Sequence, residues 1–140
     1  MAYNVLVVND PDTGYQLDSD VSTTTLASDL LNEVPTSAGA VTQATDKSTG
    51  VTLSKMTGKI TMNAANLAAA TIVSFTLTNT LITATDILDV KHVSGGTSAA
   101  YTVTAFPAAG SAVISVRNNT AGGLAEAIVL RFKINRSADA

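Results

Sequence analysis

The stretch IVSFTLT, residues Ile72–Thr78, alternates apolar and hydroxyl-bearing side chains over most of its length. Successive side chains of a β-strand point to opposite faces, so this pattern predicts a strand that buries Val73, Phe75 and Leu77. The segment Ala127–Asn135 follows the same rule, and its buried face would carry Ile128, Leu130, Phe132 and Ile134. Strands with one apolar and one polar face are typical of antiparallel sheets covered on one side.

Short strand-like segments continue in both directions from this stretch. Turn-forming residues separate them, and we expect breaks at Thr57-Gly58, Asn79-Thr80, Ser94-Gly95-Gly96, Pro107-Ala108-Ala109-Gly110 and Asn118–Gly123. The further strands expected are Val51–Lys55, Lys59–Met62, Asp86–Val93, Ala100–Phe106 and Ala112–Arg117. The alanine-rich segment Asn63–Ala70 is expected to be a loop. About eight short antiparallel strands at a spacing of roughly ten residues predict an all-β fold, a β-sandwich or jelly roll.

The first part of the chain has a different pattern, and we interpret residues 1–40 as an N-terminal arm ahead of a body formed by residues 41–140. Tyr3–Val8 is strand-like and ends at the turn-forming run Asn9–Gly14. Thr24–Glu33 has leucines at helical spacing and a proline shortly after it, which predicts one short helix. The small residues of Thr36–Ala40 are expected to form a linker.

Charge is divided unevenly between the arm and the body. The arm holds six acids and no Lys or Arg, whereas the body holds five acids and eight bases, so net charges of −6 and +3 give the overall −3. We expect the arm either to be solvated or to dock on a basic neighbour, which is its own body or another subunit. The bases are scattered along the sequence, which disfavours nucleic-acid binding, and no apolar run is long enough for a membrane span.

Residues that could support catalysis or metal binding are few. The chain of 140 residues has no cysteine and one histidine, His92, so disulfides, zinc–thiolate sites and cysteine nucleophiles are excluded. The aspartates at 10, 12, 18 and 20 lack the glycine and the bidentate glutamate that a calcium loop of the EF-hand type requires. No G-x-S-x-G motif is present. We therefore predict no catalytic residue, no metal, no cofactor and no enzymatic activity.

From Val41 onward the chain resembles a domain of bacteriophage virion proteins. Four segments carry the resemblance: VTQATDKSTGVTLSKMTGKITMN (Val41–Asn63), SFTLTNTLI (Ser74–Ile82), HVSGGTSAAYTV (His92–Val103) and AVISVRNNTAGGLAEAIVLRFKI (Ala112–Ile134). Such domains are similar to trimeric jelly-roll modules, which occur in head decoration (cement) proteins and at the C-terminal ends of fibre proteins. The resemblance therefore implies a structural role on a phage particle.

The segment ahead of the body bears on the choice between these two places. No heptad repeat or G-x-y run offers a fibre shaft, so we expect a capsid decoration protein, a homotrimer that binds the major capsid protein and stabilises the shell. The start of the chain does not resemble a secretory signal, and we expect synthesis in the host cytoplasm and a final location on the capsid surface. The alternative is a receptor- or glycan-binding knob of a tail fibre or spike, with the loops Ser94–Ser98 and Asn118–Gly123 as its contact region.

These expectations assign provisional roles to two groups of residues. The expected capsid contacts lie in the arm and are Tyr3, Val5, Val7, Asp10, Asp12, Asp18 and Asp20. The expected subunit contacts lie in the body and are His92, Tyr101 and Arg117.

Overall fold

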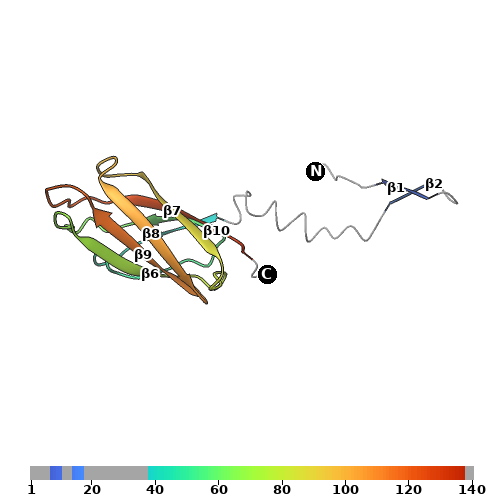
Figure 1. The fold of residues 1–140 in the computed structure, drawn as a ribbon, viewed down its shortest axis with the longest axis horizontal. Coiled ribbons are helices and arrows are strands. Elements are labelled where there is room, and N and C mark those ends of the chain that lie inside the picture. Colours follow the sequence, from blue (N-terminus) through green and yellow to red (C-terminus); the bar gives the residue numbers. More distant parts are fainter. Residues whose placement is uncertain (1–6, 11–13, 18–37, 138–140) are drawn as a thin grey trace. The chain divides into compact units, whose positions relative to one another are not determined.

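A computed structural model describes residues 7–10, 14–17 and 38–137 of the chain. The chain divides into two compact units, Met1–Val34 and Pro35–Ala140, which we call the N-terminal and C-terminal units (Figure 1). The predicted boundary between residues 40 and 41 falls inside a strand of the C-terminal unit.

The described part of the N-terminal unit is a β-hairpin. β1 (Val7–Asp10) pairs antiparallel with β2 (Gly14–Leu17), and Asp10 lies opposite Gly14 at the closed end. Of the predicted strand Tyr3–Val8, Val7 and Val8 lie in β1, and residues 3–6 lie outside the described residues. Asn9 and Asp10 were expected in the turn, but they belong to the strand because they pair with the residues that open β2. The predicted helix, Thr24–Glu33, lies outside the described residues.

The C-terminal unit consists of two four-stranded sheets (Figure 1). The first sheet has the strand order β3 (Ala38–Thr42), β5 (Thr57–Thr61), β10 (Val129–Asn135) and β7 (Ile87–Ser94). The second has the order β4 (Val51–Thr52), β6 (Ile72–Thr78), β9 (Ser111–Asn118) and β8 (Tyr101–Ala108). From β3 to β10 each strand lies in the other sheet from its predecessor, except for the β8–β9 hairpin.

Apolar side chains from the inner faces of both sheets form one core. The second sheet contributes buried residues such as Phe75, Leu77 and Ile114, and the first contributes Ile60 and Leu130 among others. The alternation predicted for β6 and β10 is confirmed, since the alternate apolar side chains face inward and the residues between them face outward; the inward residues are Val73, Phe75 and Leu77 in β6 and Leu130, Phe132 and Ile134 in β10. The protein is thus all-β with two sheets sharing a core, an arrangement consistent with a β-sandwich, and none of the described residues is helical.

Two strand pairs depart from the expected antiparallel arrangement. β3 pairs parallel with β5, and β4 pairs parallel with β6. The physical reason is that the chain crosses between the two sheets. The two strands of each parallel pair are separated in the chain by a strand of the other sheet, so no hairpin connects them and the pair need not be antiparallel. Both parallel additions, β3 and β4, are edge strands.

Three predicted breaks or linkers belong to strands instead. Gly58 is buried within β5, where a Cβ would collide with the ring of Phe132, so this glycine makes room for a core side chain. Pro107 lies in β8, which pairs only with β9 and is therefore an edge strand that tolerates proline. Residues 38–40 of the expected linker belong to β3, and Gly39 lets the Leu53 side chain approach. The expected loop at 63–70 is confirmed, since it has only a bridge from Leu67.

Candidate interaction surfaces

A buried lysine joins two loops where the chain enters β10. Lys47 is only 3% exposed, and its ammonium donates to the backbone carbonyls of Asn63 and Glu126, the latter at 2.6 Å. Burial lowers the pKa of Lys47 from its usual 10.5, although the nearby Glu126 carboxylate opposes that shift. The side-chain amide of Gln43, also buried, donates to the Lys47 and Thr49 carbonyls and accepts from the Asn63 amide. We call Gln43, Lys47, Glu126, Thr97 and Tyr101 the lysine cluster.

The carboxylate of Glu126 holds the loop between β7 and β8. It accepts the backbone N–H of Thr97 at 2.6 Å, the Thr97 hydroxyl at 3.1 Å and the Tyr101 hydroxyl at 2.8 Å. The Thr97 amide, followed by the Tyr101 hydroxyl, holds the pKa of Glu126 below its usual 4.5. Burial, with the same hydrogen bond, raises the pKa of Tyr101 far above 10.0. Gly96 has φ +66°, and a Cβ there would lie 2.7 Å from the Glu126 carboxylate, so the loop requires glycine.

His92 and Tyr101, two of the predicted subunit contacts, meet inside one chain. Their rings are 5.4 Å apart in an edge-to-face arrangement, and they come from β7 and β8 at the same edge of the two sheets. His92 Nε2 lies 3.0 Å from the Ser94 carbonyl and 2.6 Å from the Gly95 carbonyl, so this nitrogen must carry the hydrogen. The third residue, Arg117, is exposed on the outer face of the second sheet, so the structure brings together only two of the three.

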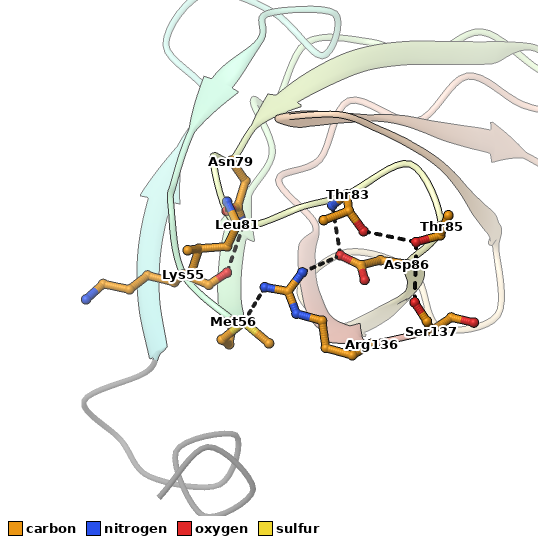
Figure 2. Close-up of polar contacts among 9 residues, drawn as sticks. All are labelled: Lys55, Met56, Asn79, Leu81, Thr83, Thr85, Asp86, Arg136 and Ser137. Carbon is orange, nitrogen blue, oxygen red and sulfur yellow. Dashed lines mark hydrogen bonds and ion pairs between the residues drawn. The ribbon is translucent and has the colours of Figure 1, made fainter. Parts of the chain in front are cut away.

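A second polar cluster lies at the other end of β10 (Figure 2). Asp86 is 3% exposed, and its Oδ2 accepts the Thr83 amide and the Arg136 guanidinium, both at 2.8 Å. Burial raises the pKa of Asp86, but the hydrogen bonds from Thr83, the charge of Arg136 and the Ser137 amide together hold it below 3.8. Oδ1 of Asp86 is buried without a hydrogen-bond partner in the described part of the chain. We call Asp86, Thr83 and Arg136 the aspartate cluster.

A buried asparagine positions the loops near the lysine cluster. Asn118 is fully buried, and its side-chain amide donates to the carbonyls of Leu67, Ala68 and Gly122. Its Oδ1 accepts the backbone amide and the hydroxyl of Thr120. The backbone N–H of Asn119 donates to the Ala100 carbonyl at 2.9 Å. The loops at residues 63–71, 94–100 and 118–126 are therefore held together at one end of the sheets.

The outer face of the first sheet is basic. Lys59 on β5, Arg131 on β10 and Lys91 on β7 lie side by side in register, and Lys133 occupies the next outward position of β10. Asp89 is the one acid among the outward residues of this sheet, and it lies 3.7 Å from Lys91. Bases that are scattered along the sequence thus gather on one surface. We call Lys59, Lys91, Arg131 and Lys133 the basic face.

The outer face of the second sheet has the opposite character. Apart from Arg117, its outward residues are uncharged, mostly Ser and Thr with three exposed apolar side chains: Phe106 (76% exposed), Ile72 (59%) and Val113 (46%). Phe106 and Val113 are register partners on neighbouring strands. The Ser74 and Ser115 hydroxyls, which are also neighbours in register, are 2.8 Å apart. The two sheets therefore present faces of contrasting chemistry, one charged and one neutral.

Two of the predicted capsid contacts can be placed. Val7 and Asp10 are the first and last residues of β1, opposite Leu17 and Gly14 of β2. The other five, Tyr3, Val5, Asp12, Asp18 and Asp20, lie outside the described residues.

The described residues offer a limited set of chemical groups. No three His, Asp or Glu side chains among residues 7–10, 14–17 and 38–137 gather as a metal site would require. No helix in that part of the chain is long and apolar enough to cross a membrane.

Sequence reasoning missed five buried or clustered polar residues, because a polar residue within a polar stretch gives no periodic signal of its burial. They are Gln43, Lys47, Asp86, Asn118 and Glu126.

Comparisons of the chain with family models, with curated proteins and with solved structures find no match in any of the three. The functional argument therefore depends on the residues and on the geometry described above.

Proposed function

We propose that this chain is a structural virion protein, a decoration or cement protein that binds the outer surface of a phage capsid as a homotrimer. In this proposal the arm contacts the major capsid protein and the body remains on the shell surface. The protein would work by adhesion, linking neighbouring capsid subunits, with no bond making or breaking.

One observation carries the proposal: the segments that resemble phage virion domains meet at the lysine cluster. Val41–Asn63 supplies Gln43 and Lys47, His92–Val103 supplies Thr97 and Tyr101, and Ala112–Ile134 supplies Glu126. A resemblance caused only by Thr- and Ala-rich composition would have no reason to include the residues that hold one end of the fold. The resemblance thus involves a specific set of interacting residues.

The strand order supports a jelly-roll interpretation of the body. Within the antiparallel set β5 to β10, the first strand pairs with the last, the second pairs with the one before the last, and β8 and β9 form the connecting hairpin. This nested pairing is the wrapping expected of a Greek-key or jelly-roll fold, and β3 and β4 extend it as parallel edges. Loops that are held in place by hydrogen bonds from buried polar side chains would suit a module that bears mechanical load.

The trimer can be tested by the solution mass of the full chain. We expect about 43 kDa by light scattering, three times the 14.2 kDa of one chain. A mass of one chain at micromolar concentration would contradict the trimer.

Capsid binding can be tested by cosedimentation of the full chain with capsids of the parent phage that lack it. We expect saturable binding, and we expect a variant with Asp10, Asp12, Asp18 and Asp20 changed to asparagine to lose it. The matched control is Asp89→Asn, an exposed aspartate of the body, which should bind normally. Cryo-electron microscopy of the virion then gives the location, and density at the tail tip with none on the capsid would refute the proposal.

A receptor- or glycan-binding knob is the second candidate, and one observation favours it. The two loops expected to form such a contact region, at residues 94–98 and 118–123, are held at the same end of the sheets by Ala100, Asn119 and Glu126. A glycan array and a host-cell binding assay separate the candidates, because a decoration protein should give no saturable binding in either.

A further inference from the structure

The second sheet turns an almost uncharged surface outward. We call this surface the neutral face; it consists of the alternate, outward residues of β6, β9 and β8 within residues 72–78, 111–117 and 102–108. Seven of its twelve residues are Ser or Thr, four are apolar and one is Arg117. The outer face of the first sheet carries five charged side chains instead: Lys59, Asp89, Lys91, Arg131 and Lys133.

An apolar patch lies within the neutral face. Phe106 is 76% exposed, more than any other large apolar side chain in the described part of the chain. Its register partner Val113 is 46% exposed and pairs in turn with Thr76, so a ring and two branched side chains form one row across the sheet. The centres of protein–protein interfaces are rich in aromatic side chains and poor in charged ones. By this criterion the neutral face is better suited to a protein contact than the basic face.

The hydroxyl groups make the neutral face complementary to a copy of itself. Each Ser or Thr hydroxyl can both donate and accept a hydrogen bond. Ser74 and Ser115 illustrate this within one sheet, since their hydroxyl oxygens are 2.8 Å apart. Lysine and arginine side chains only donate, and two copies of the basic face would repel each other. A second copy of the chain is therefore accommodated better by the neutral face.

We propose that the neutral face binds the neutral faces of neighbouring copies and forms the subunit contact of the homotrimer. This inference rests on the proposed function, which supplies the three copies, and it names the surface that joins them. In a closed ring of three chains, a face turned toward the three-fold axis contacts both neighbours. Phe106 and Val113 then lie in the buried part of the contact, and Arg117, two rows away along the strands, lies at the polar rim.

Two other occupants of the neutral face are less well supported. The acidic arm carries six acids, but the neutral face offers it one cation, Arg117, so the charges do not favour the arm. The major capsid protein is the second alternative, although the proposed function already gives that contact to the arm. Contact with the capsid protein is treated as an outcome of the test.

The test is the solution mass of two full-length double variants, measured by light scattering at the same concentration as the wild type. Phe106→Ser with Val113→Ser removes the apolar patch, and we expect the mass to fall from about 43 kDa, three chains, to the 14.2 kDa of one chain. The matched control, Ile87→Ser with Val93→Ser, removes side chains that are 63% and 47% exposed on the first sheet, and it should remain a trimer. Because all four side chains are exposed, both variants should keep the fold, which circular dichroism checks.

A cross-link locates the contact without changing the apolar patch. The chain contains no cysteine, so Ser115→Cys places one thiol per chain between the row of Phe106 and the row of Arg117. Packed sheets lie about 10 Å apart, so a bismaleimide of that reach should join two chains of each trimer into a covalent dimer. Lys59→Cys, on the outer face of the first sheet, is the control and should give several-fold less dimer.

The contrary results separate this inference from the proposed function. A wild type and a Phe106→Ser, Val113→Ser variant that are both trimers would overturn the inference and leave the homotrimer in place. A trimeric variant that no longer cosediments with capsids would show that the neutral face binds the capsid protein, which also overturns it. A wild type with the mass of one chain would remove the homotrimer and the inference together. Equal yields of covalent dimer from the thiols at positions 115 and 59 would contradict a contact at the neutral face.

Discussion

The two ends of β10 each bury one ionisable side chain, but the two ends satisfy it differently. Ahead of the strand, the Lys47 ammonium donates to two backbone carbonyls that belong to separate loops. After the strand, the Asp86 carboxylate shares one oxygen between the Thr83 amide and Arg136, while its other oxygen has no hydrogen bond within the described residues. Arg136 is itself half exposed, so water is available to it if the pair breaks.

The difference teaches that a buried charge holds a loop most firmly when its partners are backbone groups. A backbone carbonyl cannot turn away toward water, so removal of its donor leaves it unsatisfied at a cost of about 1–3 kcal/mol. An exposed guanidinium can find water instead, so removal of its carboxylate costs less. We therefore expect the lysine cluster to contribute more to stability than the aspartate cluster.

The largest effect is expected for Lys47→Met, which keeps the length of the side chain and removes its ammonium. Two carbonyls lose their donor, while the desolvation of the charge is relieved, and we expect the free energy of unfolding to fall by about 2–4 kcal/mol in chemical denaturation. The control is Lys59→Met, an exposed lysine of β5, for which we expect a change below about 0.5 kcal/mol. Equal effects at the two lysines would show that Lys47 does not anchor these loops.

A smaller effect that depends on pH is expected for Asp86→Asn. The carboxylate loses its charge beside Arg136, and we expect a loss of about 1 kcal/mol at pH 7. Because the folded pKa of Asp86 is below 3.8, the unfolded chain binds its proton first as the pH falls, and this stabilisation is present above pH 3.8 and is lost as the pH drops through the folded value.

The contribution of Asp86 to the pH dependence is the difference in unfolding free energy between the wild type and the Asp86→Asn variant. Asp46 and Glu126 also have lowered pKa values, so the wild type loses stability in acid for more than one reason. Unfolding measured from pH 7 to pH 2 should show the variant and the wild type converging in acid. A gap that stays constant across this range would mean that the charge of Asp86 is not what stabilises the fold.

The same contrast explains how much could be predicted from the sequence. Period-two alternation is a local signal, so the strands within Ile72–Thr78 and Ala127–Asn135, and the faces that they bury, could be predicted from the sequence. Gly58 was interpreted as a break, since nothing near it in sequence reveals the Phe132 ring that needs its space. Lys47 and Glu126 are 79 residues apart and meet only through the fold. Likewise, the basic face arises from strand order, which brings β5, β10 and β7 together.

Tyr101→Phe tests whether the lysine cluster extends to the loop between β7 and β8. The variant keeps the ring beside His92 and removes the hydroxyl that donates to Glu126, so we expect a loss of about 1 kcal/mol in unfolding free energy. The pKa of Glu126 should rise toward 4.5, which carboxyl NMR titration can follow. Thr104→Val, at an exposed position of the same strand, is the control and should change neither quantity. An unchanged Glu126 titration would place Tyr101 outside the cluster.

The smallest effect, of opposite sign, is expected midway between the two ends, at the exposed Arg131. Replacing it by glutamine breaks the row of like charges with Lys59 and Lys91, so we expect the free energy of unfolding to rise by about 0.3–0.5 kcal/mol at low salt. Screening weakens repulsion between exposed charges, so the gain should disappear in 0.5 M salt. This change in the free energy of unfolding is opposite in sign to those expected for the buried charges at either end. An exposed charge is already solvated by water, so the charges of its neighbours determine whether its removal stabilises or destabilises the protein. A loss of stability at low salt would mean that Arg131 makes favourable contacts that outweigh the repulsion from Lys59 and Lys91.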